Sequence, residues 1–271
     1  MAKDTLIPES GDYSAALAGA RAALLDHLPK DLILASYEQA GGKEVLSGKF
    51  ANPESSASLA ANAFGLFLDQ PNLFSLPTPF LAAGSAASVT LEAQMRFPWG
   101  GGLHPWLDAA IETEEALLGI ESKRYEPFRD TKSVSFSDAY SRPVWGGSMV
   151  AFEKMRDSLV SGQTRFLFLD AAQLVKHAFG LRTQGVKRGK SATLIYLYAE
   201  PKTYPDGRPI PAGEITAHRA ELARFAKAVS DPTAEVRFES LCYAELLANW
   251  RLSPNEALQK HALALSLRFD V

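Results

Sequence analysis

Two short apolar runs that lie close together constrain this chain more than any other feature of its sequence. Trp106–Ile111 and Leu117–Glu121 are separated by the linker Glu112–Ala116. An apolar run of four to eight residues between polar residues is typical of a buried strand. Because the linker is short, we expect the two strands to pair as an antiparallel hairpin.

Charged residues are concentrated at one end of this hairpin. Asp108 comes three positions after Pro105, and Glu121-Ser122-Lys123 begins thirteen positions after the aspartate, which gives the form P-x-x-D…E-x-K. Alternate residues of a strand share a face, so Glu121 and Lys123 are expected on one face. Asp108 can lie across from them on the neighbouring strand, at a distance of about 5 Å.

Two carboxylates and an ammonium group that meet on a hydrophobic hairpin need a compensating cation, because burying unpaired charge is costly. Hard oxygen ligands suit Mg²⁺, and a lysine beside such an ion can stabilise or activate a nucleophilic water. The pattern therefore predicts a site for metal-assisted phosphodiester hydrolysis. A second interpretation stays open, because an E-S-K-R run at a strand end is often a solvated edge with a weak surface ion pair.

Composition narrows the class of protein. The chain has 271 residues, of which 46% are hydrophobic and 22% charged, as in ordinary globular proteins. No apolar run approaches the roughly 20 residues of a membrane span, and the first residues lack an apolar signal core, so we expect a soluble, cytoplasmic protein. The single cysteine, Cys242, excludes an internal disulfide and a cysteine-based zinc site. Its apolar neighbours predict a buried structural thiol.

The pattern W-L-D…I-E-S-K-x-x-E-P covers the charged end of the hairpin and continues to Pro127. At these residues the chain resembles the PD-(D/E)xK nuclease superfamily, whose fold is that of restriction endonucleases. More narrowly, it resembles bacterial restriction endonuclease-like proteins that carry this pattern. The resemblance extends over roughly Glu92–Pro201. It implies a restriction-endonuclease-like α/β core with a mixed central sheet flanked by helices.

The resemblance also implies roles for individual residues. Asp108 and Glu121 would bind Mg²⁺, or Mn²⁺ in its place, with the backbone carbonyl of Ser122 as a further ligand. Lys123 would position or deprotonate the attacking water, or neutralise charge that develops on the phosphate. The auxiliary acids that the resemblance suggests are Glu92, Glu126 and Glu54, of which Glu54 is equally well explained as a charge near a helix N-terminus.

DNA contacts are expected from a helix and from basic residues near it. The segment 171–181 resembles the Gln-x-x-x-Tyr helix of RecB-like nucleases, except that His177 stands where the tyrosine is expected. Residues 120–190 hold 13 Lys and Arg against 7 Asp and Glu, a balance that would attract a phosphate backbone or is a chance fluctuation of surface charge. The expected DNA-contacting residues are Gln173, Lys176, Arg124, Arg142, Lys187 and Arg188.

The whole chain is expected to form one α/β domain, with a mixed sheet of four to six strands and helices on both faces. Residues 1–85 should be mainly helical, with 1–11 disordered or loosely packed. Residues 86–200 should form the catalytic core, and 201–271 the closing helices and an edge strand. The further strands predicted are 89–97, 192–199 and 236–241; the helices are 13–28, 52–68, 150–159, 171–181, 216–229, 243–251 and 255–267; the loops are 69–85 and 128–145.

These observations favour a Mg²⁺-dependent nuclease that cuts DNA, and a homodimer if it cuts both strands. Two other classes stay open: a non-catalytic nucleic-acid-binding module on the same fold, and a soluble protein that binds a small acidic ligand. A Ser-His-Asp hydrolase is disfavoured, because the sequence has no G-x-S-x-G elbow.

Overall fold

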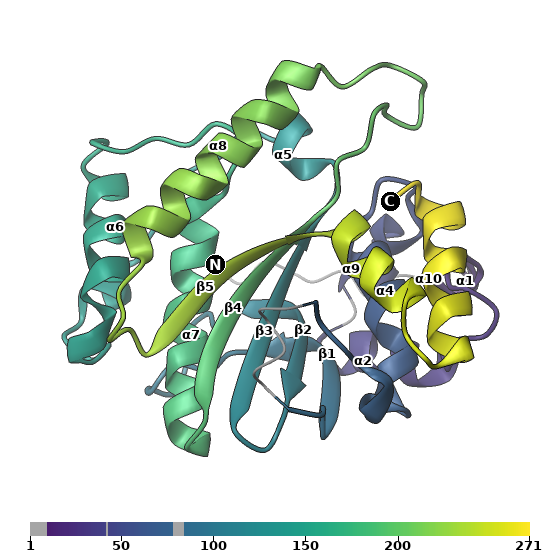
Figure 1. The fold of residues 1–271 in the computed structure, drawn as a ribbon, viewed down its shortest axis with the longest axis horizontal. Coiled ribbons are helices and arrows are strands. Elements are labelled where there is room, and N and C mark those ends of the chain that lie inside the picture. Colours follow the sequence, from purple (N-terminus) through teal and green to yellow (C-terminus); the bar gives the residue numbers. More distant parts are fainter. Residues whose placement is uncertain (1–9, 42, 78–83) are drawn as a thin grey trace.

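The computed structural model describes residues 10–41, 43–77 and 84–271, which are built around a five-stranded sheet (Figure 1). The strands are β1 (Ser88–Gln94), β2 (Trp106–Glu112), β3 (Ala116–Lys123), β4 (Ser191–Tyr198) and β5 (Val236–Cys242). They lie in the order β1-β2-β3-β4-β5 across the sheet. The pairs β1–β2 and β2–β3 are antiparallel, whereas β3–β4 and β4–β5 are parallel. The predicted mixed α/β fold is confirmed.

The predicted hairpin is β2 and β3, with Ala109 opposite Ile120. Because β3 lies in the middle of the sheet, every residue in it except Lys123 is buried, which explains a continuous apolar run in place of alternation. Gly119 permits this packing. A Cβ atom there would lie 2.5 Å from Leu107 Cδ1, so a larger residue would force the buried Leu107 to move.

Helices cover both faces of the sheet. Figure 1 shows α6, α7 and α8 on one side and α1, α2, α4, α9 and α10 on the other. We call the buried apolar residues under the first group the α7 core and those under the second group the α4 core. The helices are α1 (Ser10–Ala23), α2 (Lys30–Gln39), α3 (Lys43–Leu46), α4 (Ser56–Phe64), α5 (Glu126–Arg129), α6 (Val150–Val160), α7 (Ala171–Arg188), α8 (Ala212–Val229), α9 (Tyr243–Arg251) and α10 (Glu256–Phe269).

Most predicted elements are present with shifted ends. The ambiguous segment 30–47 forms α2 and α3. α4 begins later than predicted because Ser55 caps it, with its Oγ accepting a 3.0 Å hydrogen bond from the Ser58 N–H. α7 runs seven residues beyond its predicted end and stops at Gly189, whose φ of 65° ends the helix in the left-handed region. The segments predicted as disordered (1–11) and as loop (69–85) lie partly outside the described residues.

Two remaining predictions concern Cys242 and membrane spans. Cys242, predicted as a buried structural thiol, is partly buried at the end of the edge strand β5. Burial nevertheless raises the pKa of its thiol to about 11, which disfavours a reactive thiolate. Across the described ranges, no helix combines the length and the apolar character needed to cross a membrane.

Candidate active site

The register of the hairpin brings Asp108, Glu121 and Lys123 together at one end of β2 and β3. Asp108 Oδ2 accepts a 2.6 Å hydrogen bond from the backbone N–H of Ser122, and Lys123 Nζ forms an ion pair with Glu121 Oε1. The Glu121 side chain is 3% exposed and the Lys123 side chain 15% exposed. A solvated surface pair is therefore excluded for these two residues.

Glu92 joins this group from β1 with an unusual backbone conformation. Its φ is 47°, in the left-handed region that a residue with a Cβ atom adopts at a cost of about 1–3 kcal/mol. The alternation of β1 changes here, because Leu91 packs in the α4 core and Ala93 in the α7 core. The pKa of Glu92 rises to about 7, first through burial and then through the charges of Glu44 and Glu121.

These residues line a strongly acidic cavity of about 540 Å³. Asp108 shows the effect of the crowding: burial and the charge of Glu121 raise its pKa well above the ordinary value, although Lys123 opposes the shift. Seven carboxyl groups face three cations, which amounts to an excess of four negative charges when all the acids are ionised, and a bound cation would relieve it. The carboxylates belong to Glu44, Glu54, Glu92, Asp108, Glu121, Glu126 and Asp130, and the cations to Lys49, Lys123 and Arg129.

The donor set fits Mg²⁺ or Mn²⁺ without forming a complete cage. Asp108 and Glu121 offer hard oxygen donors on neighbouring strands, and Mg²⁺ is typically held by one or two carboxylates while it keeps several waters. Within residues 10–41, 43–77 and 84–271, no group of three or more His, Cys, Asp or Glu side chains is arranged to hold a metal ion. The cavity thus suits an open, partly hydrated ion.

α7 places a histidine against the carboxylates. His177 Nε2 lies 3.4 Å from Glu121 Oε2, and both side chains are 3% exposed. Burial lowers the pKa of His177, so the neutral ring can donate its Nε2–H to the glutamate. Gln173, one turn earlier, lines the acidic cavity. His177 was noted in the sequence as a departure from a nuclease pattern and not as a site residue, although its spacing from Gln173 places both on one side of α7.

The auxiliary acids Glu54 and Glu126 also line the cavity. Glu54 lies just before the Ser55 cap of α4 and forms an ion pair with Arg129. Glu126 Oε2 accepts a 2.9 Å hydrogen bond from the Arg124 N–H.

Two predicted site residues face away from the cavity. The Ser122 hydroxyl lies 2.7 Å from the Tyr243 hydroxyl on the α4 side of the sheet, which leaves its backbone at the site. Arg124, a predicted DNA contact, is buried, and its guanidinium donates to the backbone carbonyls of Pro53 and Phe269. It therefore links segments that are distant in the chain.

The other predicted DNA contacts are spread over the molecule. Lys176 lies near the site, with its Nζ 5.3 Å from the centre of the Phe136 ring, and Arg142 is exposed over Trp99. Lys187 and Arg188 end α7 near the turn of the hairpin, where Arg188 Nη1 lies 2.7 Å from Glu112 Oε2. They do not join the acidic cavity, because α7 is longer than predicted and carries them to the opposite end of β2.

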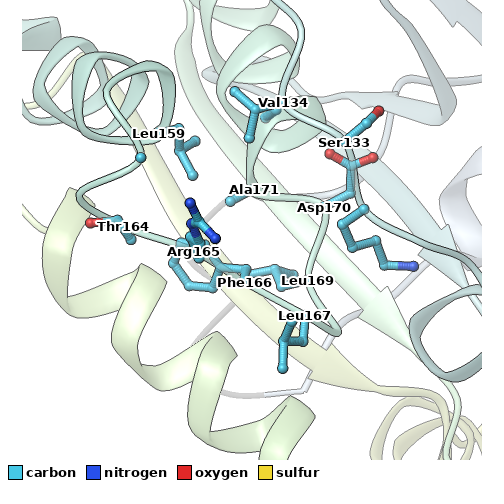
Figure 2. Close-up of a pocket in the computed structure, with 13 residues that line it drawn as sticks. Ser133, Val134, Leu159, Thr164, Arg165, Phe166, Leu167, Leu169, Asp170 and Ala171 are labelled. Carbon is cyan, nitrogen blue, oxygen red and sulfur yellow. The ribbon is translucent and has the colours of Figure 1, made fainter.

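A further cavity of about 410 Å³ lies beside the start of α7 (Figure 2). Figure 2 shows Arg165 on one side of it and Asp170 with Ser133 on the other. Asp170 is the carboxylate among its described lining residues, and its Oδ1 already accepts the Gln173 N–H at 2.8 Å as the helix cap. This cavity lacks the crowded carboxylates that make the acidic cavity suitable for a metal ion.

A mixed five-stranded sheet covered by helices on both faces is consistent with the core of a restriction-endonuclease-like protein. The chain belongs to the family described as "Restriction Endonuclease associating with ARP", which matches residues 22–269. Comparison with curated proteins gave no match, and neither did comparison with solved structures. The resemblance to a restriction-endonuclease-like family is thereby confirmed.

Proposed function

We propose that this protein is a Mg²⁺-dependent nuclease that hydrolyses phosphodiester bonds of DNA at Asp108, Glu121 and Lys123. One observation carries the proposal: a nearly buried glutamate–lysine pair meets a second carboxylate at a cavity with excess negative charge. Crowded carboxylates with raised pKa values are typical of functional sites. The restriction-endonuclease family of the chain supports DNA as the substrate.

Asp108 and Glu121 would hold the ion together with the backbone carbonyl of Ser122. The bound ion would act as a Lewis acid and lower the pKa of a bound water. Burial alone would lower the pKa of Lys123, but the charges of Glu121, Asp108 and Glu126 raise it above its ordinary value. A lysine that stays protonated neutralises charge on the phosphate and does not deprotonate water. We therefore assign Lys123 the charge-neutralising role.

Glu92 and His177 support this centre in different ways. Glu92 has a pKa of about 7 and lines the same cavity, so it is our candidate for the acceptor of the water proton near neutral pH. We assign His177 a positioning role, because its Nε2 lies 3.4 Å from one oxygen of Glu121 and groups beside a metal ligand orient it.

The acidic wall makes substrate binding depend on the ion. A phosphate backbone is repelled by the excess negative charge of the cavity until a divalent cation reduces it. A non-catalytic nucleic-acid-binding module is the second candidate, favoured by the lack of a ready three-ligand cluster in the described part of the chain. Such a module would bind DNA equally well in a chelator and would not cut it.

The family description supplies a proposal about partners. It names association with ARP, and we propose that this chain works beside a partner of that kind. A homodimer remains a prediction that follows from cutting both strands of a duplex.

The test is cleavage of supercoiled plasmid and of single-stranded DNA with Mg²⁺, with Mn²⁺ and with chelator. Lys123→Ala and Asp108→Ala are compared with Lys190→Ala, whose lysine is also 15% exposed and lies near a glutamate. We expect metal-dependent nicking by wild type and Lys190→Ala, lost in the other two variants. Cleavage in chelator, or equal cleavage by all variants, contradicts the proposal. Metal-independent DNA binding without cleavage supports the binding module.

A further inference from the structure

A second cavity, of about 580 Å³, adjoins the acidic cavity and has a different wall. Trp106 and Gln173 line both cavities, and His177, which contacts Glu121, lines the second one as well. No aspartate or glutamate is among the described residues that line it. We call it the aromatic cavity after Phe97, Trp99, His104, Trp106 and Tyr140, which form much of its wall.

The connection between β1 and β2 holds this wall in place. The Phe97 N–H donates a 3.1 Å hydrogen bond to His104 Nδ1, which ties the two arms of the connection together. The buried Trp145 packs beneath, with its ring centre 5.3 Å from that of Phe97 and 5.4 Å from that of Trp99. The aromatic surface is therefore preformed in the absence of a ligand.

Trp106 stands where the two cavities meet and is 37% exposed. It precedes Asp108 by two residues of β2, about 7 Å along the strand. A flat aromatic surface next to a centre that handles phosphate suits a nucleobase, because each base presents a face that stacks on such rings. The cations near the wall, Lys176 over Phe136 and Arg142 over Trp99, favour the same ligand.

Two ring nitrogens of the lining histidines have no hydrogen-bond partner in the described structure, His104 Nε2 and His177 Nδ1. Because His104 Nδ1 accepts from Phe97, the neutral ring carries its proton on Nε2 and has a spare donor. His177 has a spare acceptor at Nδ1 when its Nε2–H faces Glu121. Unsatisfied buried groups of this kind are costly, and a base edge offers both a donor and an acceptor.

We propose that the aromatic cavity is a nucleobase subsite, which takes one unstacked base of the strand whose phosphate lies at the acidic cavity. This inference rests on the proposed nuclease function and deepens it, because it names single-stranded or locally opened DNA as the substrate. A base can reach the cavity once it has left the duplex stack. The protein should therefore bind single-stranded DNA more tightly than duplex DNA, because a duplex must first be opened near the cleaved bond at a cost in free energy.

The experiment measures binding of a labelled single-stranded oligonucleotide in Ca²⁺, with and without one abasic position that is moved along the strand. Trp106→Ala and Trp106→Phe are compared with Leu252→Ala, which removes an 86% exposed side chain at the end of α9. We expect Trp106→Ala to weaken binding about 5- to 150-fold. Trp106→Phe should retain most of the affinity, and Leu252→Ala all of it.

The abasic strand separates a stacked base from a general loss of structure. On wild type, one abasic position should weaken binding as much as Trp106→Ala does, and the two changes together should cost no more than either alone. Additive losses overturn the subsite. No loss at any position overturns it as well, even if Trp106→Ala fails to fold, because the scan uses wild type. If wild type binds neither metal nor DNA, the proposed function fails first. If it binds both and the scan is flat, the subsite alone fails.

Discussion

The two ends of the β2–β3 hairpin carry the same kinds of residues and differ in their surroundings. Near the turn, Glu112 meets two cations, with Arg188 Nη1 at 2.7 Å from one oxygen and Lys190 Nζ at 3.4 Å from the other. At the far end, Glu121 has one lysine, Lys123, and the buried His177 as neighbours, with Asp108 beside it. Lys123 and Lys190 are both 15% exposed, but Glu121 is 3% exposed and Glu112 31%.

This difference teaches what separates an ion pair that supports the fold from a charged group that can bind a ligand. At the turn end, the partly exposed Glu112 pairs with two cations, so its charge is already balanced. The other end has buried carboxylates in excess, which raise the pKa values of Asp108 and Glu92. The two ends share the same residue types, so burial and the balance of charge distinguish the end that can bind a ligand.

The largest effect is expected when the lysine at each end of the hairpin is replaced by alanine. Lys123→Ala should lower the single-turnover cleavage rate by about 10²–10³-fold, as expected when a group that stabilises developing charge is lost. Lys190→Ala should leave the rate unchanged. A rapid-quench measurement on one DNA substrate compares the two, and equal losses would show that the ends do not differ in function.

The next effect concerns stability and pH. Glu92 has a folded-state pKa of about 7, against an ordinary value of 4.5. The folded state therefore binds the proton more tightly than the unfolded state, and the free energy of unfolding falls as pH rises from 4.5 to 7. The loss is about 3 kcal/mol when complete.

Glu92→Gln should remove this loss and stabilise the metal-free protein at pH 8, with little effect at pH 4.5. Urea unfolding at the two pH values, in chelator, gives the difference directly. The matched variant Glu112→Gln should not become more stable at pH 8. A Glu92→Gln protein that is less stable than wild type at pH 8 would mean that the crowding is already relieved within the chain.

A smaller effect is expected at the histidine of α7. His177→Gln should weaken Mn²⁺ binding about 10- to 100-fold, the usual cost of losing a group that orients a metal ligand. Thr183→Ala is the control, because Thr183 lies on the same helix and its hydroxyl bonds the helix backbone at Phe179. Calorimetric titration with Mn²⁺ measures the affinity of each variant. An unchanged affinity in His177→Gln would show that His177 serves only in packing the core.

The smallest effect is expected at the turn end. Glu112→Gln should change the free energy of unfolding by at most about 1 kcal/mol, since partly exposed ion pairs contribute little. Denaturant unfolding at neutral pH measures it. A loss of several kcal/mol would mean that the turn end is as strongly coupled as the carboxylate end.

The features predicted correctly from the sequence are those that depend on local sequence patterns. The apolar runs of the hairpin, and the i, i+2 spacing of Glu121 and Lys123, depend on residues close together in the chain. The structure places Asp108, Glu92 and Glu126 at one cavity with them. The left-handed φ of Glu92 could not be predicted, because it occurs where β1 passes from packing in the α4 core at Leu91 to packing in the α7 core at Ala93.

The features that the sequence did not predict depend on contacts between residues far apart in the chain. Arg124 follows the motif directly, yet its partners Pro53 and Phe269 lie 71 and 145 residues away. His177 contacts Glu121 because α7 packs on β3, a fact that no short pattern carries. Lys187 and Arg188 were predicted DNA contacts in a basic loop, whereas they lie in the last turn of α7.

The most direct test of a metal centre at the carboxylate end of the hairpin is a titration of the metal-free protein with Mn²⁺. Binding is measured by calorimetry and by electron paramagnetic resonance. The titration needs no knowledge of the DNA sequence that the protein cuts. We predict that wild type and Glu112→Gln bind Mn²⁺, and that Asp108→Asn keeps its fold but loses Mn²⁺ binding. No binding by wild type, or equal binding by Asp108→Asn, would contradict a metal centre at the carboxylate end of the hairpin.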